Sequence, residues 1–321
     1  MWTLKPSGET LGCRIEGLDL GKPLGRSELG CILRALADYG VVCFPGQCLS
    51  AEQQVVFSRA FGQLEVHVSG MFQEPGQPEV MILSNIVSDG KPVGLADAGQ
   101  DWHTDMSFSK TIAFVNVLYA VKVPHRDGRP LGATRFANMA EAYDTLPEEV
   151  KRRIEGRSAT HDFEKFWEMM RRRAGAASSR PPLTDAQRKQ KPPVCHPLVM
   201  VHPISGRKSL YADPGYTVRI EGMPEAESEE LLQFLFHHQL QSRFQYAHRW
   251  SEDDLLVWDN LWTLHNATAD YRADEPRLMK RCQAMANLVF TPAFANLAKA
   301  AGSELSCVAG KQRHDARRIS Y

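Results

Sequence analysis

The stretch that most constrains this sequence is residues 102–108, where His103 and Asp105 stand two positions apart. Apolar and polar residues alternate through it, which is typical of a β-strand, and side chains two apart on a strand point to the same face. We therefore expect the imidazole of His103 and the carboxylate of Asp105 to enter one space. Two such groups make up most of a metal site, and the missing ligand must come from elsewhere in the chain.

We expect that ligand to be His265, at the end of residues 258–265. Two imidazoles and one carboxylate on one face of Fe(II) leave neighbouring coordination positions open, which is the arrangement of non-haem iron oxygenases. A lone His-x-Asp pattern is weak support, because the spacing also arises by chance. His125 and Asp127 share it, but they lie between a proline and a glycine, where alternation of faces cannot be assumed.

The composition restricts the classes of partner and compartment. The 38 basic and 38 acidic residues of the 321-residue chain balance to zero, so we expect neither nucleic acid nor an anionic membrane as a partner. Seven scattered cysteines without a CxxC pair favour a reducing compartment. The sequence shows no signal peptide and no apolar run of transmembrane length, so we expect a cytoplasmic protein.

Hydrophobic periodicity and stop signals predict short strands interleaved with helices. Helices are expected at 26–39, 50–62 and 224–241, with two short ones between 138 and 156 separated at Pro147. Strands are expected at 41–44, 80–83, 113–123, 197–201, 209–212, 255–258 and 283–290. This pattern predicts one α+β domain over residues 1–321, with a jelly-roll (double-stranded β-helix) core and flanking helices.

Two segments differ from the rest in composition. Residues 161–193 contain three consecutive arginines, an Ala-Gly-Ser run and several prolines and lysines, which bury little core, so we predict a mobile insertion or lid there. Residues 292–321 form a basic C-terminal tail without a functional signal.

Two arginines strengthen the metal-site hypothesis. Arg277 and Arg281 follow His265 by 12 and 16 residues. On an extended strand they would share a face, with α-carbons roughly 13 Å apart. One guanidinium could hold the far carboxylate of an iron-bound co-substrate and the other an anionic group of the substrate. The alternative is a pair of surface salt bridges.

With these motifs together, the sequence resembles the taurine dioxygenase and chlorophenoxyacetate dioxygenase family of Fe(II)- and 2-oxoglutarate-dependent enzymes. The resemblance covers nearly the whole chain, through residues 15–20, 102–105, 202–207, 258–260 and 277–281. It implies that Fe(II) is held by His103, Asp105 and His265. It also implies that Thr134 contacts 2-oxoglutarate and that Arg277 holds its distal carboxylate.

The same resemblance implies a substrate pocket. Arg281 matches the residue that meets the substrate anion, and three further positions fall near pocket residues of the family: His67, Trp167 and Tyr216. Aromatic core packing is the alternative for Trp167 and Tyr216.

The implied reaction is hydroxylation of a small organic anion, either a sulfonate, an aryloxyalkanoate or a carboxylate, with release of succinate and CO2. The expected partners are this substrate and O2, and we expect a homo-oligomer. Two alternatives stay open at this point. The chain could be a non-catalytic jelly-roll protein that binds a metal or an anion, or a zinc hydrolase, because the same three ligands could accept zinc.

Overall fold

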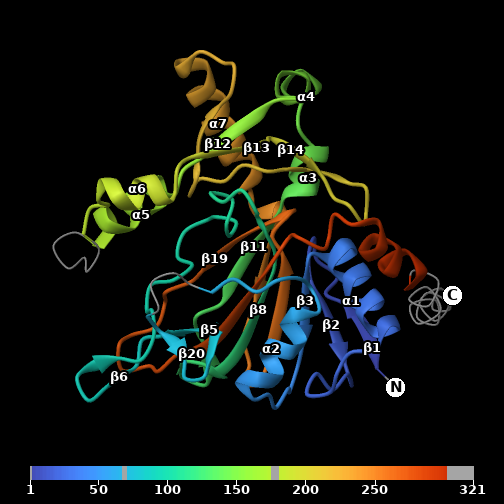
Figure 1. Ribbon diagram of the computed structural model, residues 1–321, viewed down its shortest axis with the longest axis vertical. Coiled ribbons are helices and arrows are strands. Elements are labelled where there is room, and N and C mark those ends of the chain that lie inside the picture. The colour runs from blue at the N-terminus through green and yellow to red at the C-terminus, as the bar shows by residue number, and fades with distance from the viewer. Residues whose placement is uncertain (1, 67–70, 175–180, 302–321) are drawn as a thin grey trace, which may run out of the picture.

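An eight-stranded sheet forms the centre of the computed structural model, which describes residues 2–66, 71–174 and 181–301 (Figure 1). Its strands follow the order β1-β2-β3-β18-β8-β20-β5-β4, and all neighbours are antiparallel except β2 and β3. Their bounds are β1 Thr3–Pro6, β2 Cys13–Glu16, β3 Val41–Phe44, β4 Gln73–Glu74, β5 Gln77–Ser84, β8 Ala113–Lys122, β18 Leu255–Asp259 and β20 Leu278–Met285.

A smaller sheet faces the large one. In it β11 (Thr134–Asn138) lies between β17 (Gln245–His248) and β19 (Thr263–Ala267). Phe136 of β11 packs edge-on against Trp258 of β18, with ring centroids 5.5 Å apart, so the two sheets share a core. Two facing sheets with helices outside agree with the α+β jelly-roll architecture that the sequence predicts.

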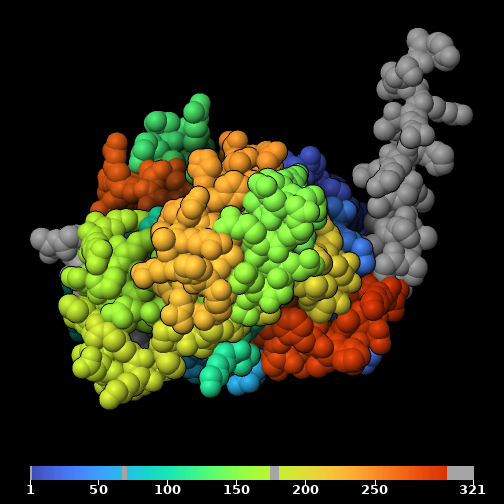
Figure 2. Space-filling model, turned by 90° about the horizontal axis from the view of Figure 1, so that it is seen from above, coloured from blue at the N-terminus to red at the C-terminus, as the bar shows by residue number. Residues whose placement is uncertain are grey.

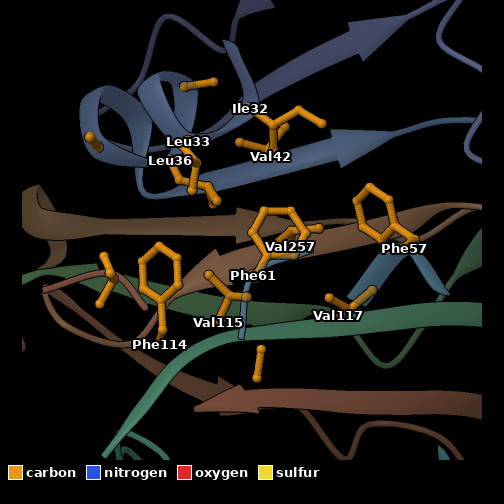
Figure 3. Close-up of a cluster of buried hydrophobic side chains, with 14 of the residues drawn as sticks. Ile32, Leu33, Leu36, Val42, Phe57, Phe61, Phe114, Val115, Val117 and Val257 are labelled. Carbon is orange, nitrogen blue, oxygen red and sulfur yellow. The ribbon is translucent and has the colours of Figure 1, made fainter. Parts of the chain in front are cut away.

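Side chains of β8 alternate between the outer face of the large sheet, which the helices cover, and its inner face. Val115 and Val117 point to the outer face, where Figure 3 shows them in one cluster with Ile32, Leu33 and Leu36 of α1 (Arg26–Tyr39) and Phe57 of α2 (Ala51–Arg59). Leu118 and the polar Asn116 therefore point to the inner face, between the sheets.

Helix ends follow the sequence signals. Gly40 ends α1 with φ 71°, a conformation that a residue with a Cβ seldom adopts. The hydroxyl of Ser50 accepts a hydrogen bond from the backbone N–H of Gln53 and caps α2, as the capping-box pattern predicts.

The helix at residues 292–301 lies beside α1, where Phe294 and Ala298 join the outer cluster. Helices α3 to α7 gather at one end of the molecule, at the top of Figure 1. Helices α3 (Met139–Asp144), α4 (Glu148–Ile154) and α7 (Glu225–Gln239) pack with short strands in a second hydrophobic cluster. The strands of this region are β12 Ser158–His161, β13 Val194–Pro197, β14 Val199–Val201, β15 Lys208–Leu210 and β16 Thr217–Ile220. Helices α5 (Phe163–Ala174) and α6 (Asp185–Gln190) stand out on one side in Figures 1 and 2.

The minor elements are the pairs β6 (Val87–Ser88) with β7 (Lys91–Pro92) and β9 (His125–Arg126) with β10 (Arg129–Pro130), and the 3-10 helix Ser242–Phe244. Among the described residues, no helix is both long and apolar enough to cross a bilayer.

Four sequence expectations need correction. Residues 102–108 do not form a strand: only His103 makes a β-bridge, and a turn follows it. The strand predicted at 283–290 begins at Leu278 and ends at Met285, because β8 and β5 extend the pairing toward the charged residues and a turn follows Met285. The described part of the insertion at 161–193 contains two helices, although their burial is slight, as the composition indicated. The segment predicted as a tail at 292–321 begins with a helix at 292–301, because Phe294 and Ala298 pack into the core beside α1, and residues 302–321 lie outside the described residues.

Candidate metal and co-substrate site

His103 and His265 are brought together by two backbone hydrogen bonds. The N–H of His103 donates to the carbonyl of His265 at 3.1 Å, and the N–H of His265 donates to the carbonyl of His103 at 2.9 Å. This isolated antiparallel bridge sets the two rings 4.2 Å apart, centroid to centroid. The third ligand expected from the sequence therefore lies beside the first.

Asp105 reaches the same place by a turn rather than along a strand. Met106 has φ 58°, and the Thr104 hydroxyl anchors the turn by donating to the carbonyl of Asn260 at 2.8 Å. The Asp105 carboxylate lies 3.5 Å from Nε2 of His103 and 3.6 Å from Nε2 of His265. The donor atoms of all three residues lie within 4.8 Å of one another, and all three residues are buried.

The surroundings fix the ring orientation and charges of the three residues. Nδ1 of His103 lies 2.8 Å from the carbonyl of Asp101, so that nitrogen carries a proton and Nε2 is the atom that faces Asp105. Burial alone would lower the pKa of His103, but the hydrogen bond and charge of Asp105 raise it, so a bound metal would replace the proton on Nε2. Burial favours protonated Asp105, but the positive charge of Arg281 and the contact with His103 outweigh it and hold the pKa of Asp105 far below its ordinary value. Burial and the neighbouring His103 lower the pKa of His265, so this imidazole is neutral.

Asp105 is also held from behind by two buried amides. Nδ2 of Asn116 donates to Oδ2 of Asp105 at 2.6 Å, and Nε2 of Gln283 donates to Oδ1 of Asn116 at 2.8 Å. Sequence reasoning missed both residues. A signal was present, because Asn116 is the one amide in the apolar run of residues 113–121.

Arg277 lies just before β20 and is only 6% exposed. Its backbone N–H donates to Oδ1 of Asn85 at 2.8 Å, and its guanidinium lies beside Tyr271, 5.9 Å from the ring centroid. No carboxylate of the described residues forms an ion pair with it. A Cβ on Gly132 would lie 3.3 Å from the Arg277 Nε, so the chain approaches the guanidinium closely two residues before Thr134.

Thr134 is 3% exposed and lies at the start of β11. Its hydroxyl oxygen accepts a hydrogen bond from the indole N–H of Trp250 at 3.1 Å, which leaves the hydroxyl hydrogen available to a ligand.

Of the expected substrate residues, Arg281 and Tyr216 lie at the metal site. Arg281 lies at the site, with Nη1 3.3 Å from Oδ2 of Asp105. The ring of Tyr216 lies 6.1 Å from the ring of His103. The aromatic residue of α5 that contacts His103 is Phe166, at 5.2 Å, and Phe166 also packs on Tyr216 at 5.0 Å.

Trp167 points elsewhere: its indole N–H donates to the carbonyl of Pro181 at 2.8 Å, and its ring packs on Phe163 at 5.8 Å. A helix turns by about 100° per residue, so neighbours on α5 cannot both face His103. His67 lies outside the described residues. His125, in the competing His-x-Asp pattern, sits in the β9–β10 hairpin and belongs to neither of the two groups of possible metal ligands found among the described residues.

The donor set suits a divalent ion that accepts both nitrogen and oxygen ligands. One carboxylate and two imidazoles, buried and with donor atoms close together, are the mixed set that non-haem Fe(II) sites use. The fold and the site together define a jelly-roll protein with a candidate site for one metal ion.

Residues 3–283 match the family model described as taurine catabolism dioxygenase TauD, TfdA family. The chain is 38% identical over 267 residues to the alpha-ketoglutarate-dependent 2,4-dichlorophenoxyacetate dioxygenase of Cupriavidus pinatubonensis, covering 78% of this chain and 86% of that one. It is 32% identical over 283 residues to pentalenolactone F synthase of Streptomyces arenae, covering 85% and 92%.

Among solved structures, AAD-2 in complex with Mn(II) and N-oxalylglycine matches with a TM-score of 0.72 and 29% identity, over 91% of this chain and all of that one. The chain belongs to the TauD, TfdA family of alpha-ketoglutarate-dependent dioxygenases. The resemblance read from the motifs is thereby confirmed, as are the fold class and the class of enzyme. Fe(II) and 2-oxoglutarate are the metal and co-substrate typical of the family.

Proposed function

We propose that this dioxygenase hydroxylates a small organic anion, with Fe(II) held by His103, Asp105 and His265. The observation that carries the 2-oxoglutarate part of the proposal is the buried guanidinium of Arg277. A charge removed from water without a partner is costly, and Arg277 has no carboxylate partner among the described residues. The distal carboxylate of 2-oxoglutarate would provide that partner, and the free hydroxyl hydrogen of Thr134 would provide a second contact.

The bound Fe(II) supplies the oxidative chemistry that couples consumption of O2 and 2-oxoglutarate to hydroxylation of the substrate, with succinate and CO2 as the other products. The protein's own residues position the reactants. The Asp101 carbonyl fixes the tautomer of His103, and Asn116 orients Asp105. Arg277 sets the orientation of the co-substrate, which matters because alignment of the reacting groups provides much of the rate enhancement.

The chemistry around Arg281 supports an anionic substrate with an apolar body. Phe166 and Tyr216 form an aromatic wall beside His103, and Phe108 continues it, 4.7 Å from Tyr216. Arg281 adds the positive charge, at the inner face of β20. The similarity to a 2,4-dichlorophenoxyacetate dioxygenase makes aryloxyalkanoates the first class to test, before sulfonates and simple carboxylates.

We also propose that residues 161–193 act as a lid. Phe166 of α5 contacts His103, and the guanidinium of Arg173, near the end of α5, pairs with Asp101 at 2.5 Å. A movement of α5 would therefore both open the aromatic wall and release the residue that orients His103.

The test is a screen of aryloxyalkanoates, sulfonates and carboxylates with purified protein, Fe(II), 2-oxoglutarate and O2. We expect at least one anionic aromatic compound to stimulate succinate formation and to be hydroxylated. An aryloxyalkanoate hydroxylated beside its ether oxygen gives a hemiacetal, which breaks down to the phenol and a 2-oxo acid, and mass spectrometry detects these products. Tight iron binding without O2 consumption across the whole panel would favour the non-catalytic alternative and reject the proposal.

A further inference from the structure

A second group of metal-binding side chains lies between the two sheets, away from the His-Asp-His site. Cys43 points inward from β3, His248 ends β17 in the facing sheet, and Asp254 immediately precedes β18. Their exposed fractions are 1%, 4% and 2%. Three separate segments thus deliver a thiol, an imidazole and a carboxylate to one buried point.

The distances suit one shared cation. One donor atom from each residue lies within 4.8 Å of the other two, and Nε2 of His248 lies 3.4 Å from Oδ2 of Asp254. Tetrahedral zinc bonds of about 2.0–2.3 Å place neighbouring donors roughly 3.3–3.8 Å apart. The buried Nε2 of His248 has no hydrogen-bond partner among the described residues, although it is aimed at this group. Such a nitrogen is expected to have a ligand or a proton acceptor.

The charges agree with a divalent ion as well. A divalent cation would bind the sulfur as the thiol proton leaves to solvent. The resulting thiolate and the Asp254 carboxylate would then balance its two positive charges, with a neutral imidazole completing the set.

We propose that Cys43, His248 and Asp254 form a structural zinc site, distinct from the iron site. A sulfur donor favours zinc over the harder Mg²⁺ and Ca²⁺. A water molecule would be the fourth ligand, and a hollow of about 500 Å³ whose walls include Arg14, Tyr246 and His248 lies beside the site. The ion would join β3 and β18 of the large sheet to β17 of the small one.

The site would also support the co-substrate pocket. Trp250 packs edge-on against His248, with ring centroids 4.7 Å apart, and its indole N–H donates to Thr134. Fixing His248 therefore restricts the residue that orients the Thr134 hydroxyl.

Cobalt substitution tests the proposal, because a thiolate ligand gives Co(II) a sulfur-to-metal charge-transfer absorption in the near ultraviolet and the iron site contains no sulfur. Metal-free full-length protein is titrated anaerobically with CoCl2. We expect the absorption in the unchanged protein and in Asp105→Ala, and its loss in Cys43→Ser and His248→Asn. Cys282→Ser, which changes another buried cysteine, is the matched control and should retain it.

Absence of the absorption in the unchanged protein, or its survival in Cys43→Ser, would overturn the proposal. If Cys43→Ser does not fold, His248→Asn and the zinc content of Asp105→Ala, which lacks one ligand of the iron site, decide. We expect about one tightly held zinc per chain in Asp105→Ala after purification without added metal. A chain without zinc and without the cobalt absorption has no such site, and neither result depends on 2-oxoglutarate turnover.

Discussion

The carboxylate of Asp105 is surrounded by four polar side chains. Asn116 donates to it at 2.6 Å, Arg281 lies 3.3 Å away, and the two histidine rings lie on its other side. Groups that orient a metal ligand in this way typically contribute a factor of about 10–100 to metal affinity. Substituting a residue that orients Asp105 without contacting the metal should therefore change the metal affinity.

Asn116→Leu tests this expectation. The leucine keeps the volume but donates no hydrogen bond to Asp105, so we expect Fe(II) affinity to fall about 10–100-fold, measured by anaerobic titration. Gln239→Leu is the matched control, since Gln239 is also a buried amide but donates to the carbonyl of Ala212. Equal Fe(II) affinity in the Asn116 variant and the unchanged protein would show that the amide does not orient Asp105.

Substitutions of Arg277 and Arg281 should affect different steady-state constants. Losing a buried charge pair costs about 2 kcal/mol or more, so Arg277→Ala should raise the KM for 2-oxoglutarate about 30-fold or more. Arg281→Ala should mainly raise the KM for the substrate. Arg277→Lys keeps the positive charge and should therefore raise the KM for 2-oxoglutarate less than Arg277→Ala does. If the two alanine variants change the KM for 2-oxoglutarate and the KM for the substrate equally, the arginines do not have separate roles.

The sequence predicted which donors meet, but not how. Period-2 spacing placed His103 and Asp105 on one face of a strand, whereas a turn with φ 58° at Met106 brings them together. A spacing of two residues is compatible with a strand and with a turn. The isolated backbone pairing of His103 with His265 shows that the turn is the case here. Asn116 and Gln283 were missed because their role depends on strand register, which a single sequence does not reveal.

At the level of elements, the segment before β20 determines where Arg277 lies. Glu275 accepts hydrogen bonds from Arg126 at 2.7 and 2.5 Å, and Asn85 binds both the carbonyl of Glu275 and the N–H of Arg277. The hydrogen bonds from Arg126 and from the N–H of Arg272 lower the pKa of Glu275 to about 2.

This lowered pKa predicts a pH-dependent contribution to stability. The folded value lies below the unfolded value of about 4.3, so the contribution is complete above that pH and is lost as the pH falls toward 2. Glu275→Gln should lower the melting temperature at pH 7, with a smaller difference at pH 3. Glu148→Gln is the control, because the Glu148 side chain is 77% exposed and should matter little. A difference that is constant from pH 7 to pH 3 would contradict the assignment.

Two neighbouring aromatic residues of α5 allow a matched test of the aromatic wall. Phe166 contacts His103, whereas its neighbour Trp167 faces Phe163 and Pro181. Phe166→Ala should raise the KM of an aromatic substrate about 10-fold, since it removes one aromatic contact. Trp167→Ala should change it little. A larger effect from the tryptophan would support the family-based assignment of Trp167 instead.

At the scale of the whole molecule, the jelly roll was predictable because its strongest patterns are local. The runs at 41–44, 113–123 and 255–258 became β3, β8 and β18, and Gly40 and Ser50 bound their helices as expected. The pairing between distant segments was not predictable, because nothing in either segment specifies its partner. The meeting of β3 with β17 near Cys43 and His248 is one such case.

The central claim is that His103, Asp105 and His265 hold one ferrous ion that supports 2-oxoglutarate turnover. The most direct measurement is succinate formation by purified protein with Fe(II), 2-oxoglutarate and O2, compared with Asp105→Ala and His265→Ala after thermal melting has shown that the variants fold. We predict turnover in the unchanged protein and none above the metal-only background in either variant. Turnover that persists in a folded Asp105→Ala or His265→Ala variant would contradict the claim.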